Sequence, residues 1–238
     1  MLEILYQDQD LIAINKPHGL LVHRSMIAAD TSEFALQMLR DQIGKMVYPA
    51  HRLDRKTAGV LLFTLNKEMN SSIQQAFAQN LIKKEYLTIL RGHTLPQGTI
   101  DYPLKKENGA IQECLTHYQT LQTTEIAVPL GKHSTSRYSL VLAKPETGRM
   151  HQLRRHFAHI LHPIIGDRPH GCNKQNKLWK ETFQHDTMLL HASKLSFNHP
   201  ITNQQIVISA DPQVEFQRAL EIINIEFPRV ENKISAQL

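Results

Sequence analysis

The chain has 238 residues, 41% of them hydrophobic and 21% charged, a composition that excludes disordered and fibrous proteins and suits one large domain or two small ones. Its 27 Lys and Arg against 22 Asp and Glu leave a net charge of +5, which favours a polyanionic partner such as a nucleic acid. The two cysteines, Cys114 and Cys172, stand far apart and exclude a disulfide framework or a zinc knuckle.

Neither a membrane anchor nor a secretion signal is evident in the sequence. The longest apolar run, over 59–65, is much shorter than the roughly 20 residues that cross a bilayer. The first residues alternate apolar side chains with acidic and amide ones, unlike the unbroken apolar core of a signal peptide. We therefore expect a cytoplasmic protein with no membrane partner.

Apolar periodicity and turn residues predict the secondary structure in chain order. The first half is expected to hold strands near 2–6 and 11–14, a helix capped by Thr31 or Ser32 and ended by Gly44, a buried strand over 60–65, a helix capped by Asn66, and a strand over 86–90. Hairpins on the same sheet are expected within 92–137. They are followed by a strand over 139–143, a basic helix from 149 to 161, strands over 194–197 and 205–209, and a last helix that opens at Asp211 and carries Val214. Strands outnumber helices and several adjoin short turns, which favours a single α+β domain with a mixed, largely antiparallel sheet and flanking helices over 1–238.

The densest charged segment is 51–56, His-Arg-Leu-Asp-Arg-Lys, immediately before the buried strand. Its acid, Asp54, is surrounded by bases that favour the ionised carboxylate. An ionised carboxylate suits a nucleophile or an electrostatic stabiliser better than a general acid. A surface cluster of ion pairs is the alternative.

A second segment, 146–156, leads into the predicted basic helix. Five apolar side chains fall in one stripe at 3.6 residues per turn: Met150, Leu153, Phe157, Ile160 and Leu161. Arg154 borders this stripe, whereas Arg155 lies toward the polar side. A guanidinium at the edge can turn inward and pair bidentately with a carboxylate, which nominates Arg154 as the partner of Asp54. The alternative is an exposed basic face that touches phosphate only.

The sequence contains little support for a metal site, a nucleotide-binding loop or a hydrolase nucleophile. His156, His159 and His162 recur every third residue, but steps of three drift around a helix, and no HExxH motif or Cys pair accompanies them. The GxxxxGK[ST], GxGxxG and GxSxG motifs are missing from the sequence. We therefore expect no metal, no nucleotide cofactor and no other cofactor.

Six ordered blocks of residues resemble the RluA-type RNA pseudouridine synthases. They are Asn15-Lys16-Pro17-x-Gly19 with Val22-His23; His51-Arg52-Leu53-Asp54-Arg55; Lys84-x-Tyr86-Leu87; Thr147-Gly148-Arg149-x-His151-Gln152-Leu153-Arg154-x-His156; His162-Pro163-Ile164-x-Gly166-Asp167; and Leu190-His191-Ala192 with Phe197-x-His199-Pro200. The blocks run in the family's order from 15 to 200, and together they are specific where any one alone is not. Segments 1–8, 22–25, 154–156 and 170–171 look most like the branch that modifies uridine 65 of transfer RNA.

The resemblance implies an isomerase that converts uridine to pseudouridine in RNA, with a central catalytic cleft. Many members of the family carry a separate amino-terminal RNA-binding domain, but we expect none here because the first block begins within the first twenty residues. By family motif, Asp54 acts at the sugar, Arg154 orients Asp54, and Tyr86 stacks on the uracil. Arg52 resembles the residue that fills the gap left when the target nucleotide flips out. The remaining expected RNA contacts are Arg55, Lys83, Lys84, Arg149 and Arg155. A monomer acting on transfer RNA is expected.

The sequence leaves other functions open. One is a ribosomal RNA synthase of the same family, and another is a non-catalytic RNA-binding module. Asp54 argues against the module, because a carboxylate at the centre of a basic loop repels phosphate. A metal-dependent nuclease is disfavoured because the acids do not cluster. For Tyr86, the alternative is an aromatic side chain packed in the core.

Overall fold

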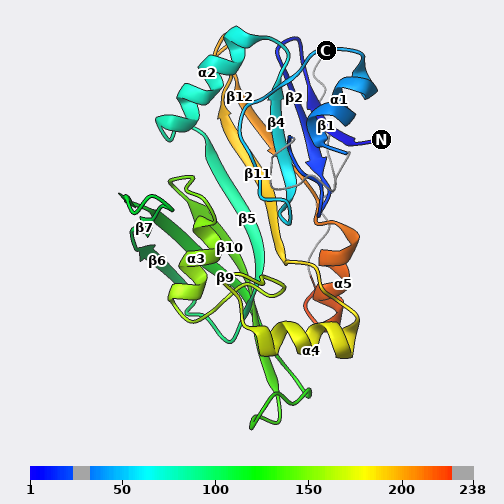
Figure 1. Ribbon diagram of the computed structural model, residues 1–238, viewed down its shortest axis with the longest axis vertical. Helices are drawn as coiled ribbons and strands as arrows, with labels where there is room; N and C mark the ends of the chain where they lie inside the picture. Colours follow the sequence, from blue (N-terminus) through cyan, green and yellow to red (C-terminus); the bar gives the residue numbers. More distant parts are fainter. Residues whose placement is uncertain (24–32, 227–238) are drawn as a thin grey trace.

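The computed structural model describes residues 1–23 and 33–226, which form a β-sheet with helices packed on both of its faces (Figure 1). Within these residues ten strands make one sheet, in the order β1-β2-β4-β11-β5-β10-β9-β6, with β3 paired to β4 and β12 to β11. The pair β4 and β11 is parallel, and the other pairs of this sheet are antiparallel. The predicted α+β fold with a mixed, largely antiparallel sheet is confirmed.

The bounds of the elements follow. The strands are β1 (Glu3–Gln7), β2 (Leu11–Lys16), β3 (Tyr48–Pro49), β4 (Ala58–Thr64), β5 (Lys83–Arg91), β6 (Gln97–Asp101), β7 (Leu104–Lys105), β8 (Ile111–Gln112), β9 (Leu115–Ile126), β10 (Ser136–Pro145), β11 (Leu190–Asn198) and β12 (Gln205–Ser209). The helices are α1 (Ala35–Ile43), α2 (Lys67–Ala78), α3 (Gln152–His159), α4 (Asn173–Phe183) and α5 (Val214–Ile222).

The strands β2 and β4 are buried along their whole length. Side chains of successive residues point to opposite faces of a sheet, so each strand supplies both sides of the core. On one side the apolar face of α2 packs through Met69 and Ile73. On the other side α1 packs through Leu39. The apolar run at 59–65 is therefore a central strand covered by a helix on each face.

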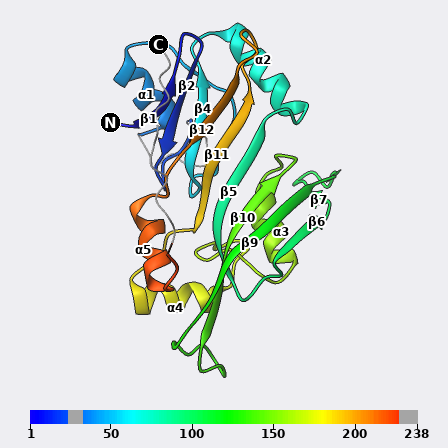
Figure 2. The ribbon, with the colours of Figure 1, turned by 180° about the vertical axis from the view of Figure 1, so that it is seen from behind.

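The strands β5 and β10 carry the second half of the core. The helix α3 covers one face of them, with Leu153 and Phe157 packed on the strands. The helices α4 and α5 cover the other face, through Trp179 and Phe216. Seen from behind, α4 and α5 lie together at the end of the sheet away from α2 (Figure 2). The start of α3 comes close to the loop between β3 and β4, where Arg154 contacts Asp54.

Two of the predicted helix ends are confirmed. The Asn66 side chain accepts a hydrogen bond from the Met69 amide at 2.7 Å and caps α2. Gly44 adopts the left-handed conformation, with φ of 65°, and ends α1. The other predicted cap, Thr31 or Ser32, lies outside the described residues; the position before α1 is occupied by Phe34, which makes no side-chain cap.

The predicted basic helix over 149–161 is too long at both ends. The backbone at His151 is left-handed, with φ of 55°, so α3 begins only at Gln152, and Leu161 is left-handed after its end. Met150 and Leu161 therefore leave the expected apolar stripe and are 54% and 80% exposed. Leu153 and Phe157 keep their predicted places in the core.

Three further expectations need correction. The sequence analysis missed α4, because most of its residues are polar and its buried contacts come largely from Trp179. Val214 begins α5 but is 75% exposed, since the buried face starts at Phe216. In the segment 92–137, β6 and β9 extend the main sheet as expected, but β7 and β8 pair with each other in a separate two-stranded sheet.

None of the helices in the described part of the chain is long and apolar enough to span a membrane. Cys114 is buried and Cys172 is partly buried, and both are free thiols. This agrees with the sequence, which predicted no disulfide framework.

Gly59 lies where β4 meets β11, directly after the loop that carries Asp54. Its φ of +108° suits glycine, and a Cβ atom added to it would lie 2.2 Å from the carbonyl oxygen of Ala192. The close approach accompanies the parallel pairing of Ala58 and Gly59 with His191 and Ala192. Any side chain at Gly59 would therefore push the Asp54 loop away from the sheet.

We expect Gly59→Ala to lower the free energy of unfolding by about 2–4 kcal/mol, because it combines a left-handed backbone with a clash against β11. Urea unfolding followed by circular dichroism measures the loss. Gly131→Ala is the matched control, since Gly131 also has a positive φ but has no atom near the added Cβ. It should lose only about 1 kcal/mol. Equal losses in both variants would contradict the packing explanation.

Candidate active site

Asp54 lies in the loop between β3 and β4, and its neighbours hold the backbone in place. Leu53 is buried beside it. The Thr57 amide donates a hydrogen bond to the Asp54 carbonyl at 3.0 Å, which closes a tight turn. The Asp54 side chain is 24% exposed. A structured turn therefore presents a carboxylate that a ligand can still reach.

Arg154 joins Asp54 to a second carboxylate. Its Nη1 donates to Asp54 Oδ2 at 2.9 Å, which is the contact expected from the sequence. Its Nε and Nη2 donate to Asp167 Oδ2 and Oδ1, each at 2.8 Å. The bidentate geometry that the sequence suggested for a carboxylate partner is thus made with Asp167, and Asp54 receives one hydrogen bond from the same guanidinium.

This cluster is anchored at its buried end. The Arg154 side chain is 7% exposed and that of Asp167 is 1% exposed. Burial alone would lower the pKa of Arg154, but its hydrogen bonds and charge interactions with Asp167 and Asp54 outweigh burial and raise that pKa. The guanidinium therefore stays charged and faces Asp54 across the physiological pH range.

Asp167 is a site residue that the sequence analysis did not select, although it closes the fifth family-like block. The Asn176 side chain, from α4, donates to the Asp167 carbonyl at 2.7 Å and accepts from the Gly166 amide at 2.9 Å. Gly166 has a φ of +80° and packs against the carbonyl of Thr187. The helix that sequence patterns missed is therefore what holds Asp167 under Arg154.

Lys16 is a second residue that the sequence analysis did not select for the site. It is fully buried, and its Nζ donates to the carbonyls of Pro17, Leu20 and Arg55 at 3.0, 2.7 and 3.2 Å. Burial lowers the pKa of Lys16 to about 7, although the nearby charge of Asp54 opposes the change. Lys16 thus ties the chain after β2 to the loop that carries Asp54.

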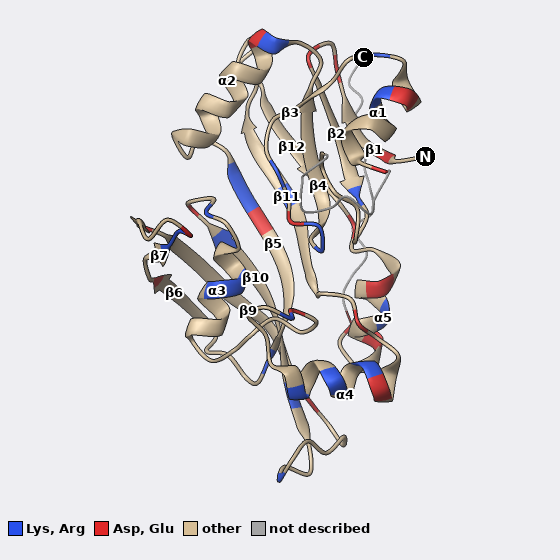
Figure 3. Ribbon diagram, in the orientation of Figure 1, with Lys and Arg blue, Asp and Glu red and all other residues tan. Residues whose placement is uncertain are grey.

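Asp54 and Arg154 line a cavity of about 110 Å³. Its walls come from the Asp54 loop, β5, the turn after β10 and the start of α3. The titratable side chains among its lining residues are Arg52, Asp54, Lys84, Tyr86, Arg149, His151 and Arg154. Figure 3 shows basic residues at the start of β5 and on α3, two of the elements that form the walls of this cavity.

Tyr86 lines the cavity from β5 and also packs against the apolar core. Its register on the sheet places it opposite Ala143 on one side and Ala192 on the other. Burial raises the pKa of Tyr86, and the charge of Asp54 adds to the effect. The phenol therefore keeps its proton, and its ring lines the same cavity as Asp54.

Three of the expected RNA contacts lie together at the rim. Arg52 and Arg149 are exposed, and Lys84 donates to the carbonyls of Glu146 and Thr147 at 3.2 and 3.3 Å. Burial and the charge of Arg149 lower the pKa of Lys84 to about 8. A second cavity of about 380 Å³ shares these three side chains and runs on toward the end of α2.

The other three expected contacts lie outside the lining of the cavity. Lys83, which alternates with Lys84 on β5, lines a separate hollow against α2 and β11. The Arg155 guanidinium donates to the Lys105 carbonyl at 3.0 Å on the β7–β8 hairpin. Arg55 is exposed and donates to the Gly19 carbonyl at 3.0 Å. From these positions the three side chains can contact a large ligand, but not a group that is bound beside Asp54.

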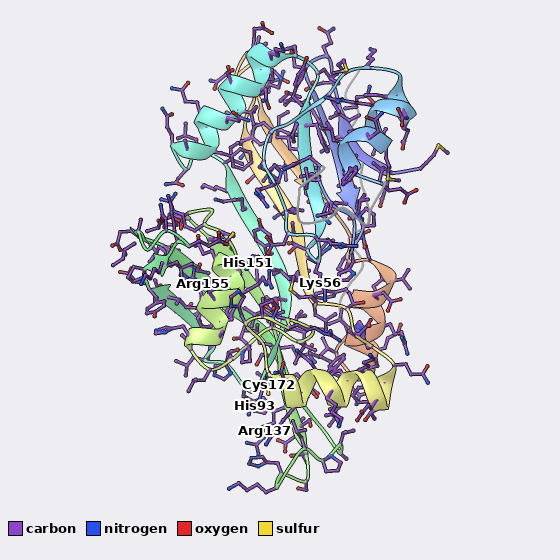
Figure 4. The ribbon with its side chains drawn as sticks, viewed as in Figure 1. Lys56, His93, Arg137, His151, Arg155 and Cys172 are labelled. Atoms are coloured by element: carbon purple, nitrogen blue, oxygen red, sulfur yellow. The ribbon has the colours of Figure 1, made fainter. Side chains whose placement is uncertain are left out.

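His151 is a third residue that sequence reasoning did not select. It stands in the left-handed conformation just before α3, whereas Arg155 lies farther along the same helix (Figure 4). Its Nε2 lies 3.8 Å from Asp54 Oδ2, and its Nδ1 lies 3.0 Å from Nε2 of His170. The family-like block that contains His151 could have indicated this residue, but the spacing of its neighbours does not predict a contact with His170.

The regularly spaced histidines of α3 have separate partners. His156 Nε2 lies 3.0 Å from the Tyr102 carbonyl, and His162 Nδ1 lies 2.9 Å from the Arg91 carbonyl. His159 stacks on the Tyr102 ring. Across residues 1–23 and 33–226, no three His, Cys, Asp or Glu side chains come together as metal ligands.

The chain matches known RNA-modifying proteins in sequence. Residues 10–159 match the family model described as RNA pseudouridylate synthase. The tRNA pseudouridine synthase C of Haemophilus ducreyi is 49% identical over 219 residues, which cover 88% of this chain and 90% of that protein. The protein of the same name from Vibrio vulnificus is 46% identical over 232 residues, which cover 93% and 95%.

Solved structures with this fold are also similar. Human RNA Pseudouridylate Synthase Domain Containing 4 superposes with a TM-score of 0.73 at 25% identity and covers 95% of this chain and 94% of its own. Human RNA Pseudouridylate Synthase Domain Containing 1 gives a TM-score of 0.71 at 26% identity, with coverage of 90% and 84%.

We expect Asp167→Asn to lower the free energy of unfolding by about 3–5 kcal/mol, because it leaves the buried guanidinium of Arg154 without its bidentate partner. Urea unfolding at neutral pH measures the loss. Glu125→Gln is the control, since it removes an exposed carboxylate paired with Arg137 and should leave the unfolding midpoint unchanged. A wild-type midpoint for Asp167→Asn would refute the anchoring role of Asp167.

Proposed function

This chain belongs to the RNA pseudouridylate synthase family and is an isomerase that converts uridine to pseudouridine in RNA, and on that premise we propose that its substrate is a transfer RNA. The observation that carries the chemistry is the Asp54 carboxylate, held by the buried guanidinium of Arg154 in a cavity lined by cations. Transfer RNA as substrate is supported by the names of similar proteins. Uridine 65 as the target is proposed from the residues that resemble the branch of the family that modifies that position.

The reaction breaks the bond between N1 of the uracil and C1′ of the ribose and forms a bond between C5 and C1′. In our proposal Asp54 acts at C1′, either as a nucleophile or as a stabiliser of positive charge. Arg154 is a positioning residue, because its contact at 2.9 Å orients the carboxylate. Tyr86 stacks on the uracil, which its place in the wall of the same cavity allows.

The rim residues are proposed to hold the RNA backbone. Lys84 and Arg149 are close enough to the cavity to neutralise phosphates beside the target nucleotide. Arg52 is exposed at the cavity mouth, where it can occupy the space left by a flipped uridine. Lys83, Arg155 and Arg55 are proposed as contacts to more distant phosphates.

The proposal includes the form in which the protein acts. We infer one catalytic domain over 1–238, a monomer, and a cytoplasmic site of action, where transfer RNA is abundant. Because isomerisation involves no net oxidation and no phosphoryl transfer, the proposed reaction needs no redox or nucleotide cofactor, and we propose that it also uses no metal. A ribosomal RNA substrate is the alternative that the following measurements decide.

We expect Asp54→Asn to abolish pseudouridine formation while RNA binding persists, because the variant keeps the shape of the side chain and loses the charge. Tritium release from RNA that contains 5-tritiated uridine measures turnover, and filter binding measures affinity. Asp8→Asn, a change in the turn between β1 and β2, is the control. Turnover by Asp54→Asn at the wild-type rate would refute the proposed role of Asp54.

We expect unmodified transfer RNA to react in preference to ribosomal RNA fragments, at uridine 65. A target in a paired stem must flip out, which costs a few kcal/mol and requires a side chain to fill the gap. Arg52→Ala should therefore lose more activity on folded transfer RNA than on an unstructured RNA of the same local sequence. Mapping pseudouridine in both RNAs tests this, and modification of the ribosomal fragments alone would refute the transfer RNA proposal.

A further inference from the structure

The isomerisation moves protons as well as the glycosidic bond. When C5 bonds to C1′, C5 still carries its hydrogen, and it must release a proton to restore the double bond of the ring. N1 takes up one proton, so the reaction as a whole is balanced. A group that accepts the C5 proton must therefore come within hydrogen-bond reach of the uracil.

Most of the titratable side chains in the cavity cannot accept a proton at neutral pH. The guanidinium groups of Arg52, Arg149 and Arg154 stay charged. Lys84, whose pKa is lowered to about 8, remains mostly protonated at pH 7. Tyr86 keeps its phenolic proton and is therefore not a phenolate that could accept a proton from C5. Among the lining residues, Asp54 and His151 are left.

Asp54 already has another role in the proposed reaction. It receives the hydrogen bond from Arg154, and the proposed function places it at C1′, on the sugar. The Nε2 atom of His151 lies beside it, 3.8 Å from Asp54 Oδ2, and the His151 side chain is 29% exposed. A uracil bound over Asp54 therefore meets the imidazole edge of His151.

The conformation of His151 is costly and is held by specific contacts. A left-handed backbone is uncommon for a residue other than glycine and often marks a functional position. The His170 ring fixes the His151 ring from the other side, with 3.0 Å between His170 Nε2 and His151 Nδ1. If His151 donates its Nδ1 proton to His170, the lone pair on His151 Nε2 faces the cavity.

Burial favours the neutral form of His151. It lowers the pKa of the imidazole more than the negative charges of Asp54 and Asp167 raise it, and the positive charges of Arg154 and Arg155 add to the lowering. The His170 ring, which has a lowered pKa of its own for the same main reason, adds little positive charge. The imidazole is thus ready to accept a proton at neutral pH.

We propose that His151 accepts the proton released from C5 of the uracil, and that His170 positions its ring. The Nε2 lone pair takes the proton, and the electrons of the C5–H bond restore the double bond in the ring. The imidazolium then lies against the Asp54 carboxylate until it loses the proton to water. This inference rests on the proposed function and assigns a step of the reaction to a residue outside the Asp54 and Arg154 pair.

The test removes the imidazole without disturbing the backbone. His151→Gly suits a positive φ, so the variant should fold. We expect kcat on 5-tritiated transfer RNA to fall by about 100-fold or more, with RNA affinity unchanged. Added imidazole should restore part of kcat, and 5-deuterated uridine should slow the variant more than it slows the wild type, because C5 deprotonation becomes rate-limiting. His159→Gly, on the exposed side of α3, is the control. Its kcat should respond neither to added imidazole nor to deuterium at C5.

The pH dependence and His170 supply independent readouts. Because the neutral imidazole is the active form, wild-type kcat should fall as the pH drops through the pKa of His151, which burial lowers from the ordinary value of histidine. In His151→Gly the rescued rate should instead follow the titration of free imidazole. His170→Ala should lower kcat and leave KM unchanged, and His170→Gln, which keeps a hydrogen-bond acceptor for Nδ1, should recover most of the loss.

The outcomes separate this inference from the proposed function. A wild-type kcat in His151→Gly overturns the inference while the proposed function stands. A low kcat that imidazole does not raise, with the isotope effect of the wild type, shows a structural role and also overturns it. A wild-type protein that forms no pseudouridine in any RNA overturns the proposed function and the inference together.

Discussion

The rest of the site depends on the division of one guanidinium between two carboxylates. Arg154 gives its two-pronged contact to Asp167, which is buried, and a single contact to Asp54, which is not. The buried half of this arrangement offsets the cost of removing the guanidinium from water, because both partners are charged and their hydrogen bonds are satisfied. The exposed half leaves Asp54 oriented but reachable. If Arg154 paired with Asp54 alone, that one pair would have to be buried with the guanidinium and also be open to a ligand.

Local patterns in the sequence predicted most of the sheet and half of the site. The run before Leu65 predicted a central strand because only apolar residues suit a strand covered on both faces. Asn66 and Gly44 predicted helix ends because capping depends on one or two neighbouring residues. Asp54 stood out by its basic neighbours, and Arg154 by its place on the helix face. These features depend on residues close to one another in the chain.

The parts that sequence reasoning missed depend on distant contacts. The helix α3 starts late because His151 takes a left-handed conformation, which no capping signal announces and which the His170 contact accompanies. Asp167 looks like an ordinary loop acid until Asn176 places it beneath Arg154. Lys16 reads as a surface base, yet its three carbonyl partners bury it. None of these contacts follows a periodic pattern. The ring that contacts His151 is 19 positions away, the amide that holds Asp167 is 9 positions away, and one of the three carbonyls around Lys16 belongs to Arg55.

The order in which these partners are synthesised has a consequence for the cell. Asp54 and Arg154 are separated by 100 positions, and the helix that steadies Asp167 follows later still. At about 5–20 residues per second, a ribosome needs roughly 5–20 s after making the Asp54 loop before it makes the arginine. During that interval the nascent chain carries the carboxylate without the group that aims it. A polypeptide that is only half made therefore lacks the guanidinium that orients Asp54, and the complete cluster can form only once the last third of the chain is being translated.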